Sequence, residues 1–220
     1  MALFLPNSPS RKKKIVLIIT LLLINQTKIP TTIASDQPIK HIVLIAIDCV
    51  NPTTLQQADT PKIDSLIESG SYTYDSCTVT PANTLSAIPA IFTGAPQEVH
   101  QLYDWTGTMK AESIIEVLEE SGYTCAIVGE SDNLGGYAAS YSTGFDYRSD
   151  HDEYYFDIAV DWLVEIEPFF MFIYTPMPDR AGHAYGLGSE EYQAVHLKQL
   201  IIISVELSRL FKIRAFMMKL

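Results

Sequence analysis

The sequence has few of the residues that mark structurally specialised proteins. Its 220 residues include only 3 cysteines, 11 glycines and 12 prolines. So few cysteines exclude a disulfide-rich framework, and so little glycine and proline exclude collagen-like and low-complexity chains. Hydrophobic residues make up 47% of the chain. At this length, that content is enough for one domain with a substantial core but short for two.

Basic residues are scarce in the middle of the chain. Residues 35–197 contain 5 Lys and Arg against 25 Asp and Glu, a formal charge of −20, whereas residues 1–34 and 198–220 are both basic. A body of this charge repels phosphate backbones and anionic lipid, so we expect no nucleic acid polymer as a partner. The charge pattern therefore divides the chain into three parts at these boundaries.

Residues 1–34 are predicted to be a signal peptide. A basic cluster at Arg11–Lys14 precedes an apolar run at Ile15–Ile24, and small residues precede a cleavage point near Ala34. The run is too short to span a bilayer, because a spanning helix needs about 20 residues. We therefore expect a secreted, periplasmic or extracellular protein with no stable membrane span after cleavage, or a tethered protein if cleavage fails. A buried N-terminal helix is the alternative interpretation.

Apolar runs alternate with helical segments in the body. Residues 41–47, 123–128 and 169–174 have the continuous apolar character of strands that are buried on both faces. Helices are expected at residues 63–67, 87–92, 111–121 and 156–166. This alternation predicts an α/β domain with a doubly wound, mostly parallel sheet. A loosely alternating segment at 71–80 could add a strand, and residues 133–152 are expected to form a long surface loop.

Three polar clusters lie where ligands of such a sheet collect, at the carboxyl ends of strands. Asp48 ends the first strand, Thr84 opens a helix, and Asp179 and His183 lie in a loop after the last strand. A carboxylate and an imidazole four residues apart suit a divalent metal, and a helix N-terminus attracts phosphate. Each pattern alone also fits a structural role: a loop cap for Asp48, a chance pair for Asp179 and His183, and a helix N-cap for Thr84 or Asn83.

The order and spacing of these segments resemble the alkaline phosphatase superfamily, specifically its type I phosphodiesterase/nucleotide pyrophosphatase branch. The resemblance rests on residues 42–48, on Thr84–Gly94 with the residues that follow it, and on the Pro178–Gly186 motif. It covers residues 41 to about 195. It implies a sheet of the alkaline-phosphatase-like type, incomplete at the C-terminus, and a hydrolase that acts on a small-molecule phosphoester.

The resemblance also implies a role for each candidate residue. Thr84 matches the nucleophile, which attacks phosphorus to form a covalent phosphoryl-enzyme intermediate, and it also contacts metal. Asp48 matches a ligand of one of two divalent metal ions, with Zn²⁺ expected, and Asp179 and His183 match ligands of the other. Two such ions clamp the attacking and leaving oxygens of an in-line displacement, so no general base is needed. A sulfatase is excluded because the Cys/Ser-x-Pro-x-Arg pattern is absent.

Two departures from the family pattern affect this interpretation. Many relatives place an Asn three residues after the nucleophile to hold a phosphate oxygen; here that residue is Ala87, which makes Asn83 the candidate substrate-binding residue. The family completes its metal sites with an Asp–His pair and a later His, whereas after His183 this chain has only His196 and no Asp. The chain is therefore interpreted as C-terminally truncated. Two alternatives stay open: a non-catalytic relative that binds at most one metal, and a phosphomutase-like relative.

Residues 198–220 form an atypical basic, apolar tail, and three interpretations account for it. The first is an amphipathic helix docked on the acidic body, with Ile202, Val205 and Leu210 among its apolar residues. The second is a broken reading frame, and the third is a basic helix that seeks a membrane surface. The broken frame is preferred, because the change in composition and the loss of family motifs coincide at one position.

Overall fold

The computed structural model describes residues 38–129, 144–147 and 153–217. The contacts divide the chain into two units, Met1–Ile39 and Lys40–Leu220, and the second contains every described helix and strand. The predicted signal peptide at residues 1–34 lies outside the described residues. Within the described part of the chain, no helix is both long and apolar enough to cross a bilayer.

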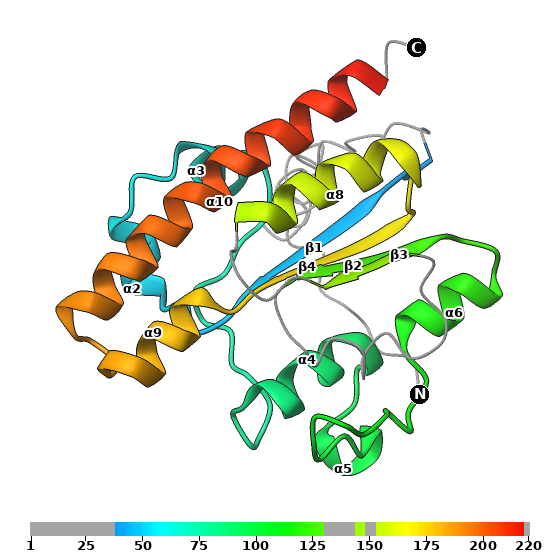
Figure 1. Ribbon diagram of the computed structural model, residues 1–220, viewed down its shortest axis with the longest axis horizontal. Coiled ribbons are helices and arrows are strands. Elements are labelled where there is room, and N and C mark those ends of the chain that lie inside the picture. The colour runs from blue at the N-terminus through cyan, green and yellow to red at the C-terminus, as the bar shows by residue number, and fades with distance from the viewer. Residues whose placement is uncertain (1–37, 130–143, 148–152, 218–220) are drawn as a thin grey trace, which may run out of the picture. The chain divides into compact units, whose positions relative to one another are not determined.

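The second unit is built around a four-stranded sheet in which all neighbouring strands are parallel (Figure 1). The strand order is β1-β4-β2-β3, with the bounds β1 (Ile42–Ile47), β2 (Cys125–Gly129), β3 (Gly144–Tyr147) and β4 (Phe170–Thr175). The last of the three predicted apolar runs therefore lies inside the sheet, between the other two. The sheet confirms the predicted α/β class with a doubly wound, parallel arrangement.

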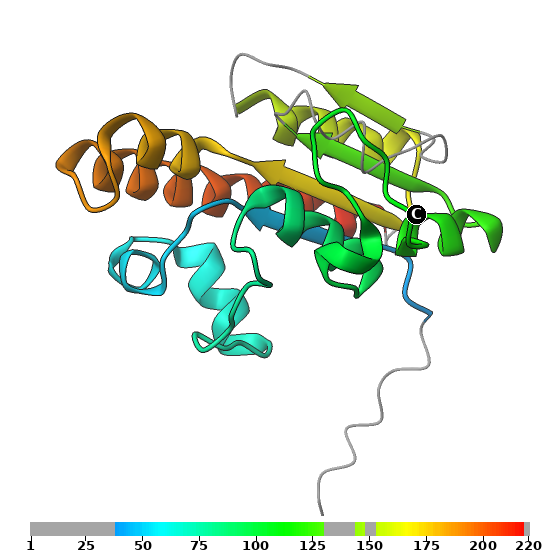
Figure 2. The ribbon, with the colours of Figure 1, turned by 90° about the horizontal axis from the view of Figure 1, so that it is seen from below.

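Helices cover both faces of the sheet. They are α2 (Pro52–Gln57), α3 (Pro61–Ser69), α4 (Thr84–Thr93), α5 (Gln97–His100), α6 (Ile114–Glu120), α8 (Glu153–Glu165), α9 (Met177–Tyr185) and α10 (Glu190–Met217). In Figure 1, α8 and α10 lie above the sheet and α4 to α6 below it, and Figure 2 views the sheet from the side of α4. Covering both faces removes water from β2 and β4, which explains why their sequences are continuously apolar.

Two hydrophobic clusters form the core, one on each face of the sheet. Because side chains alternate along a strand, Phe172 of β4 packs in the cluster that includes residues of α4 and α6. Its neighbours Met171 and Ile173 pack in the other cluster, with residues of α8 and α10. The ring of Phe92 in α4 meets the ring of Phe172 edge-on at 4.8 Å. The helix that begins with Thr84 is thus fixed to the centre of the sheet.

The long helix α10 continues without a break across the predicted boundary at residue 198. Its residues Ile203, Leu207 and Leu210 are buried in the core cluster shared with α8. This packing agrees in part with the docked-helix interpretation of the tail. Of the expected docking residues, Leu210 is buried, whereas Val205 is 57% exposed. The boundary itself stays a prediction.

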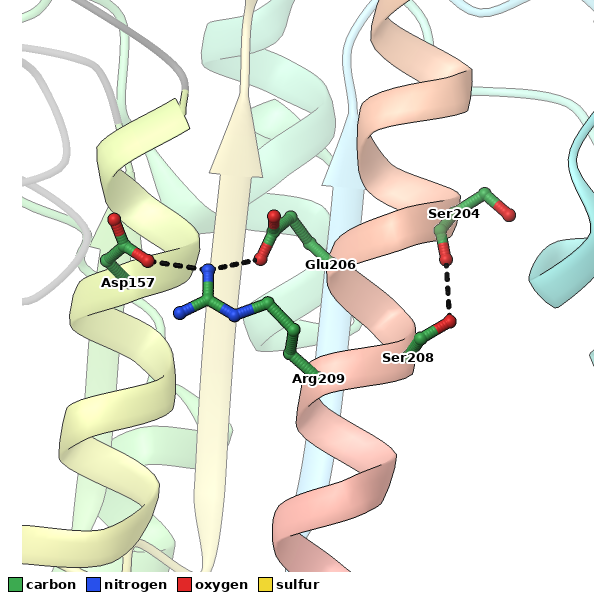
Figure 3. Close-up of polar contacts among 5 residues, drawn as sticks. All are labelled: Asp157, Ser204, Glu206, Ser208 and Arg209. Atoms are coloured by element: carbon green, nitrogen blue, oxygen red, sulfur yellow. Dashed lines mark hydrogen bonds and ion pairs between the residues drawn. The ribbon is translucent and has the colours of Figure 1, made fainter.

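Polar contacts add to the apolar packing between α8 and α10. The Arg209 guanidinium lies 2.6 Å from an Asp157 carboxylate oxygen on α8 and 2.7 Å from Glu206 on its own helix (Figure 3). All three side chains are partly exposed, so water screens these ion pairs and each contributes little to stability. The apolar cluster therefore accounts for most of the attachment of α10 to the sheet.

Two segments differ from the sequence-based expectation. Residues 71–80, predicted as a possible strand, contain no strand, and most of their side chains are exposed. Residues 133–152, predicted as a surface loop, include β3, which pairs with β2. The short segment forms a strand through its pairing with β2, because strand formation depends more on the neighbouring strands than on local composition. The rest of that segment lies outside the described residues.

Candidate active site

Asp48 directly follows β1 and lies at the edge of the sheet where the carboxyl ends of the strands meet. Its backbone N–H donates to the carbonyl oxygen of Thr175, the last residue of β4, at 2.9 Å. Its side-chain Oδ2 accepts a hydrogen bond from the Thr84 hydroxyl at 3.0 Å and another from the Tyr174 hydroxyl at 2.7 Å. Asp48 and Thr84, predicted from sequence to act together, therefore lie within hydrogen-bond distance although 36 residues separate them.

Thr84 is the first residue of α4, a ten-residue helix. Asn83 is the N-cap: its Oδ1 accepts from the backbone N–H of Ser86 at 3.0 Å and from the Ser86 hydroxyl at 3.1 Å. The first turn of a helix has N–H groups without helical partners and a positive dipole end, both of which favour anions. The Asn83 carbonyl group is thus engaged in capping, and a substrate contact by this residue stays a prediction.

Asp179 and His183 lie on α9, which corrects the expectation that they lie in a loop. Their spacing of four residues places both on one face of the helix, in its first and last turns. The His183 Nε2 is 3.6 Å from Asp179 Oδ2, and the His183 side chain is 83% exposed. The local sequence concealed the helix because the motif contains Pro178 and Gly182, and Pro is tolerated in a first helical turn.

The charge of Asp48 affects the Asp179 carboxylate. Burial raises the pKa of Asp179, the negative charge of Asp48 raises it further, and His183 lowers it. Two acids that repel each other are stabilised when a cation lies between them, because the cation offsets the charge of both. Asp48, which directly follows β1, and Asp179, on α9, thus contribute to one region of negative potential.

The donor set of this region fits divalent metal ions in its chemistry. Carboxylate, hydroxyl and imidazole groups are common ligands of Zn²⁺ and similar cations, and burial of Asp179 favours neutralisation by a cation. The donors form two pairs: Asp48 with Thr84, and Asp179 with His183. Among the described residues, no group of three or more His, Cys, Asp and Glu side chains is arranged to hold an ion. Each pair therefore offers part of a coordination sphere.

A cavity of about 440 Å³ begins at Cys49, the residue that follows Asp48. Its wall is formed by residues 49–51, which follow β1, and by Leu187, Gly188, Tyr192 and Gln193. Cys49 has a positive φ of 61°, so the backbone turns sharply immediately after Asp48. The Tyr192 hydroxyl donates to the Cys49 carbonyl oxygen at 2.7 Å and fixes this turn to α10. None of the lining side chains carries a formal charge, in contrast to the adjacent carboxylates.

Burial keeps the thiol of Cys49 in its protonated form. Burial raises its pKa, and the negative charge of Asp179 raises it further. A protonated thiol is a weak nucleophile, so Cys49 acts as a neutral part of the cavity wall.

Sequence reasoning assigned no role to Tyr174, which contacts Asp48, or to the buried His196. Tyr174 contacts Asp48 across 126 residues of chain, and only the register of β1 with β4 reveals the contact. His196 is fully buried on α10, and neither ring nitrogen has a hydrogen-bond partner in the described part of the chain. Burial lowers the pKa of His196, which favours the neutral ring. No sequence signal identified Tyr174, whereas His196 was noted only as the one histidine after His183.

His100, in contrast, has a structural role. Its Nδ1 accepts from the backbone N–H of Leu102 at 3.1 Å, which leaves Nε2 to donate to the Ser86 carbonyl oxygen at 3.3 Å. The ring is fully buried and joins α5 to the first turn of α4. Its contacts are with the backbone and not with the carboxylates of the site.

A parallel sheet with an acid directly after β1 and a threonine at the start of α4 agrees with the resemblance to the alkaline phosphatase superfamily. Residues 42–211 match the type I phosphodiesterase / nucleotide pyrophosphatase family, and the chain therefore belongs to that family. The match extends beyond the predicted limit of the resemblance, into the second half of α10. No curated protein sequence matches this chain.

Solved structures of similar fold share little sequence with the chain. Phosphonoacetate hydrolase from Sinorhizobium meliloti 1021, in complex with phosphonoacetate, has a TM-score of 0.62 at 17% identity over 80% of this chain and 54% of that one. An inactive threonine-to-alanine variant of murine ectonucleotide pyrophosphatase/phosphodiesterase 5, in complex with AMP, has a TM-score of 0.66 at 16% identity over 79% and 53%. The human protein of that name has a TM-score of 0.65 at 18% identity, over 78% of this chain and 52% of that one. The chain thus spans about half the length of these structures.

Proposed function

We propose that this chain carries the nucleophile-bearing part of a metal-dependent phosphoester hydrolase of the phosphodiesterase/nucleotide pyrophosphatase type. The observation that carries the proposal is the 3.0 Å hydrogen bond from the Thr84 hydroxyl to Asp48 at the N-terminus of α4. Family membership supports the reaction class. The murine relative also supports it, since its inactive form differs by a threonine-to-alanine change and binds AMP.

In the proposed reaction on a phosphodiester, the Thr84 hydroxyl oxygen attacks phosphorus as the bond to one ester oxygen breaks. The hydroxyl proton passes by way of Asp48 to the departing oxygen, which leaves as an alcohol. The result is a phosphoryl adduct at Thr84 that still carries the second ester group, and water hydrolyses it to a phosphate monoester and free Thr84. The free N–H groups in the first turn of α4 are suited to bind phosphate oxygens as charge develops on them. Asp48 orients the hydroxyl by accepting its hydrogen bond.

Two divalent metal ions, for which Zn²⁺ is proposed, would be held by Asp48 with Thr84 and by Asp179 with His183. When bound, such ions supply positive charge that stabilises the attacking and leaving oxygens. The uncharged cavity that begins at Cys49 offers about 440 Å³ for the organic part of a small phosphoester. We therefore propose a small-molecule substrate whose phosphoryl group meets Thr84 and whose remainder occupies this cavity.

One observation favours a second candidate function, that of a non-catalytic relative that binds at most one metal. No described group of three donors surrounds a single position, and His183 is 83% exposed. In this case the chain would bind a cation weakly at Asp48 or Asp179 and would not form a phosphoryl adduct at Thr84. The stoichiometry of Zn²⁺ binding separates the two candidates: two ions per chain support the hydrolase, and one or none supports the non-catalytic relative.

The nucleophile is tested by substituting two threonines at opposite ends of α4. The chain is incubated with Zn²⁺ and bis(p-nitrophenyl) phosphate, and both p-nitrophenol release and the phosphoryl adduct at residue 84 are measured. Thr84→Ala should abolish both signals. Thr93→Ala, which removes a hydroxyl bonded to the Pro89 carbonyl oxygen at the other end, should retain them. Full activity of Thr84→Ala would show that the nucleophile is misassigned.

We further propose that residues 1–34 export the chain. The basic cluster before the short apolar run supports this role. N-terminal sequencing of the protein recovered from expressing cells provides the test. A mature N-terminus near Ser35 is expected, and an intact N-terminus on an untethered protein retained in the cytoplasm would contradict the proposal.

A further inference from the structure

Tyr174 connects the centre of the sheet to the candidate active site. It lies near the carboxyl end of β4, paired with Ala46 of β1 on one side and Gly129 of β2 on the other. Its side chain is only 4% exposed, and its ring stacks against that of Phe172 at a centroid distance of 6.5 Å. The ring therefore has little freedom to move, because closely packed core side chains are confined to one rotamer.

The hydroxyl of this fixed ring donates to Asp48 Oδ2 at 2.7 Å. That distance is within the range of a hydrogen bond from a hydroxyl to an ionised carboxylate, which is stronger than one between neutral groups. The same oxygen accepts the Thr84 hydroxyl at 3.0 Å. One carboxylate oxygen thus accepts two hydrogen bonds from hydroxyl groups, one on β4 and one at the start of α4.

Asp48 needs such a contact because of its place in the fold. It follows β1, an edge strand of the described sheet, and its successor Cys49 has a left-handed backbone conformation. The first two residues of β1 are exposed and the other four half-buried, whereas all six residues of β4 are buried. A hydrogen bond from the more rigid strand therefore restricts the rotation of the Asp48 side chain more than the local backbone does.

We propose that Tyr174 is a positioning residue that holds the Asp48 carboxylate in the orientation used for Thr84 and for metal binding. The proposal rests on the proposed function, since it assigns Tyr174 a role only through Asp48. Hydrogen-bond partners of metal-binding carboxylates commonly affect metal affinity by about 10-fold to 100-fold. Loss of the hydroxyl alone, with the ring retained, should therefore weaken the site while leaving the core packed.

The test compares the full chain with Tyr174→Phe and with Tyr123→Phe as the matched control. Tyr123 also packs against a phenylalanine, with its ring 4.3 Å from that of Phe169, but it lies at the opposite end of the sheet. Zn²⁺ affinity is measured by isothermal titration calorimetry, and the unfolding midpoint of each metal-free chain is measured in urea. We expect Tyr174→Phe to lose about 10-fold in Zn²⁺ affinity and Tyr123→Phe to stay within about twofold.

The outcomes separate this inference from the function on which it rests. If the wild-type chain binds no Zn²⁺, the proposed function fails, and the positioning role fails with it. If the wild-type chain binds Zn²⁺ and Tyr174→Phe binds equally well, only the positioning role is overturned. If Tyr174→Phe does not fold, Tyr174→Met is tested in the same way. Should neither variant fold, the hydroxyl serves the fold instead, and the positioning role is overturned.

Discussion

Asp48 and Asp179 lie beyond the carboxyl ends of two adjacent strands, but different contacts hold them. Asp48 receives hydrogen bonds from Thr84 and Tyr174, which belong to a core helix and to the central strand β4. Asp179 lies on the separate helix α9, and its nearest described ion-pair partner is the highly exposed His183 at 3.6 Å. The protein thus orients one carboxylate by hydrogen bonds from its core and leaves the other beside a single exposed histidine.

The largest expected effect follows from loosening the helix that carries Thr84. Phe92 is 2% exposed and meets Phe172 at 4.8 Å, so Phe92→Ala leaves a cavity between α4 and the sheet. We expect the free energy of unfolding to fall by about 3–5 kcal/mol, measured by urea denaturation. Ile91→Ala is the control, because Ile91 is 49% exposed on the same helix and should change stability by no more than about 0.5 kcal/mol. Equal losses would show that α4 is not anchored through Phe92.

The two halves of the site should differ in their contribution to metal binding. Asp48→Ala removes an oriented carboxylate and should weaken Zn²⁺ binding by at least about 100-fold in calorimetry. His183→Ala removes a largely exposed ligand and should cost only about 10-fold. Asp75→Ala, in an exposed loop, serves as the control for the loss of one negative charge. A larger effect of His183→Ala than of Asp48→Ala would reverse the comparison.

The raised pKa of Asp179 predicts a dependence of stability on pH in the metal-free chain. The folded chain holds the Asp179 proton more tightly than the unfolded chain does. The contribution of Asp179 to the free energy of unfolding is therefore greatest below the ordinary pKa of 3.8 and is lost as the pH rises through the raised pKa. Asp179→Asn should therefore raise the thermal unfolding midpoint at pH 7, by about 2 °C after allowance for partial exposure, and leave it unchanged at pH 3. A lowered midpoint at pH 7 would contradict the assigned cause, which is burial next to Asp48.

The smallest expected effect on folding stability concerns the edge strand that leads to Asp48. Val43 of β1 is 38% exposed, and in the described sheet β1 pairs only with β4. An apolar edge strand promotes association between molecules, and a lysine on it opposes this. Val43→Lys should reduce aggregation in light scattering while changing the unfolding free energy by only about 0.5 kcal/mol. Val164→Lys, on the exposed face of α8, should not reduce aggregation.

Much of the fold follows from local sequence, because long apolar runs of the right length form buried strands. The segments around Ile45, Ile127 and Phe172 were predicted in this way, and all three became strands. β3 was missed because its few residues become a strand only by pairing with β2. The helix around Asp179 was missed because its polar residues, Pro and Gly are equally frequent in loops.

The candidate site was predictable where a residue type and its position in an element both carry information. Asp48 follows a predicted strand and Thr84 opens a predicted helix, so their proximity could be expected, and the 3.0 Å contact agrees with it. Tyr174 could not be found in this way, because a tyrosine within an apolar strand usually contributes packing alone. Its role in the site depends on the pairing of Ala46 with Tyr174, which is a property of the folded sheet.

The central proposal is that Asp48 with Thr84, and Asp179 with His183, hold two cations for phosphoryl transfer. Anomalous diffraction from crystals of the chain grown with Zn²⁺ tests this claim most directly. The account predicts strong zinc peaks bonded to Asp48 and to Asp179, with Thr84 adjacent to the first. Zinc bound only elsewhere on the acidic surface, with Asp48 still engaged by Thr84 and Tyr174 alone, would contradict it.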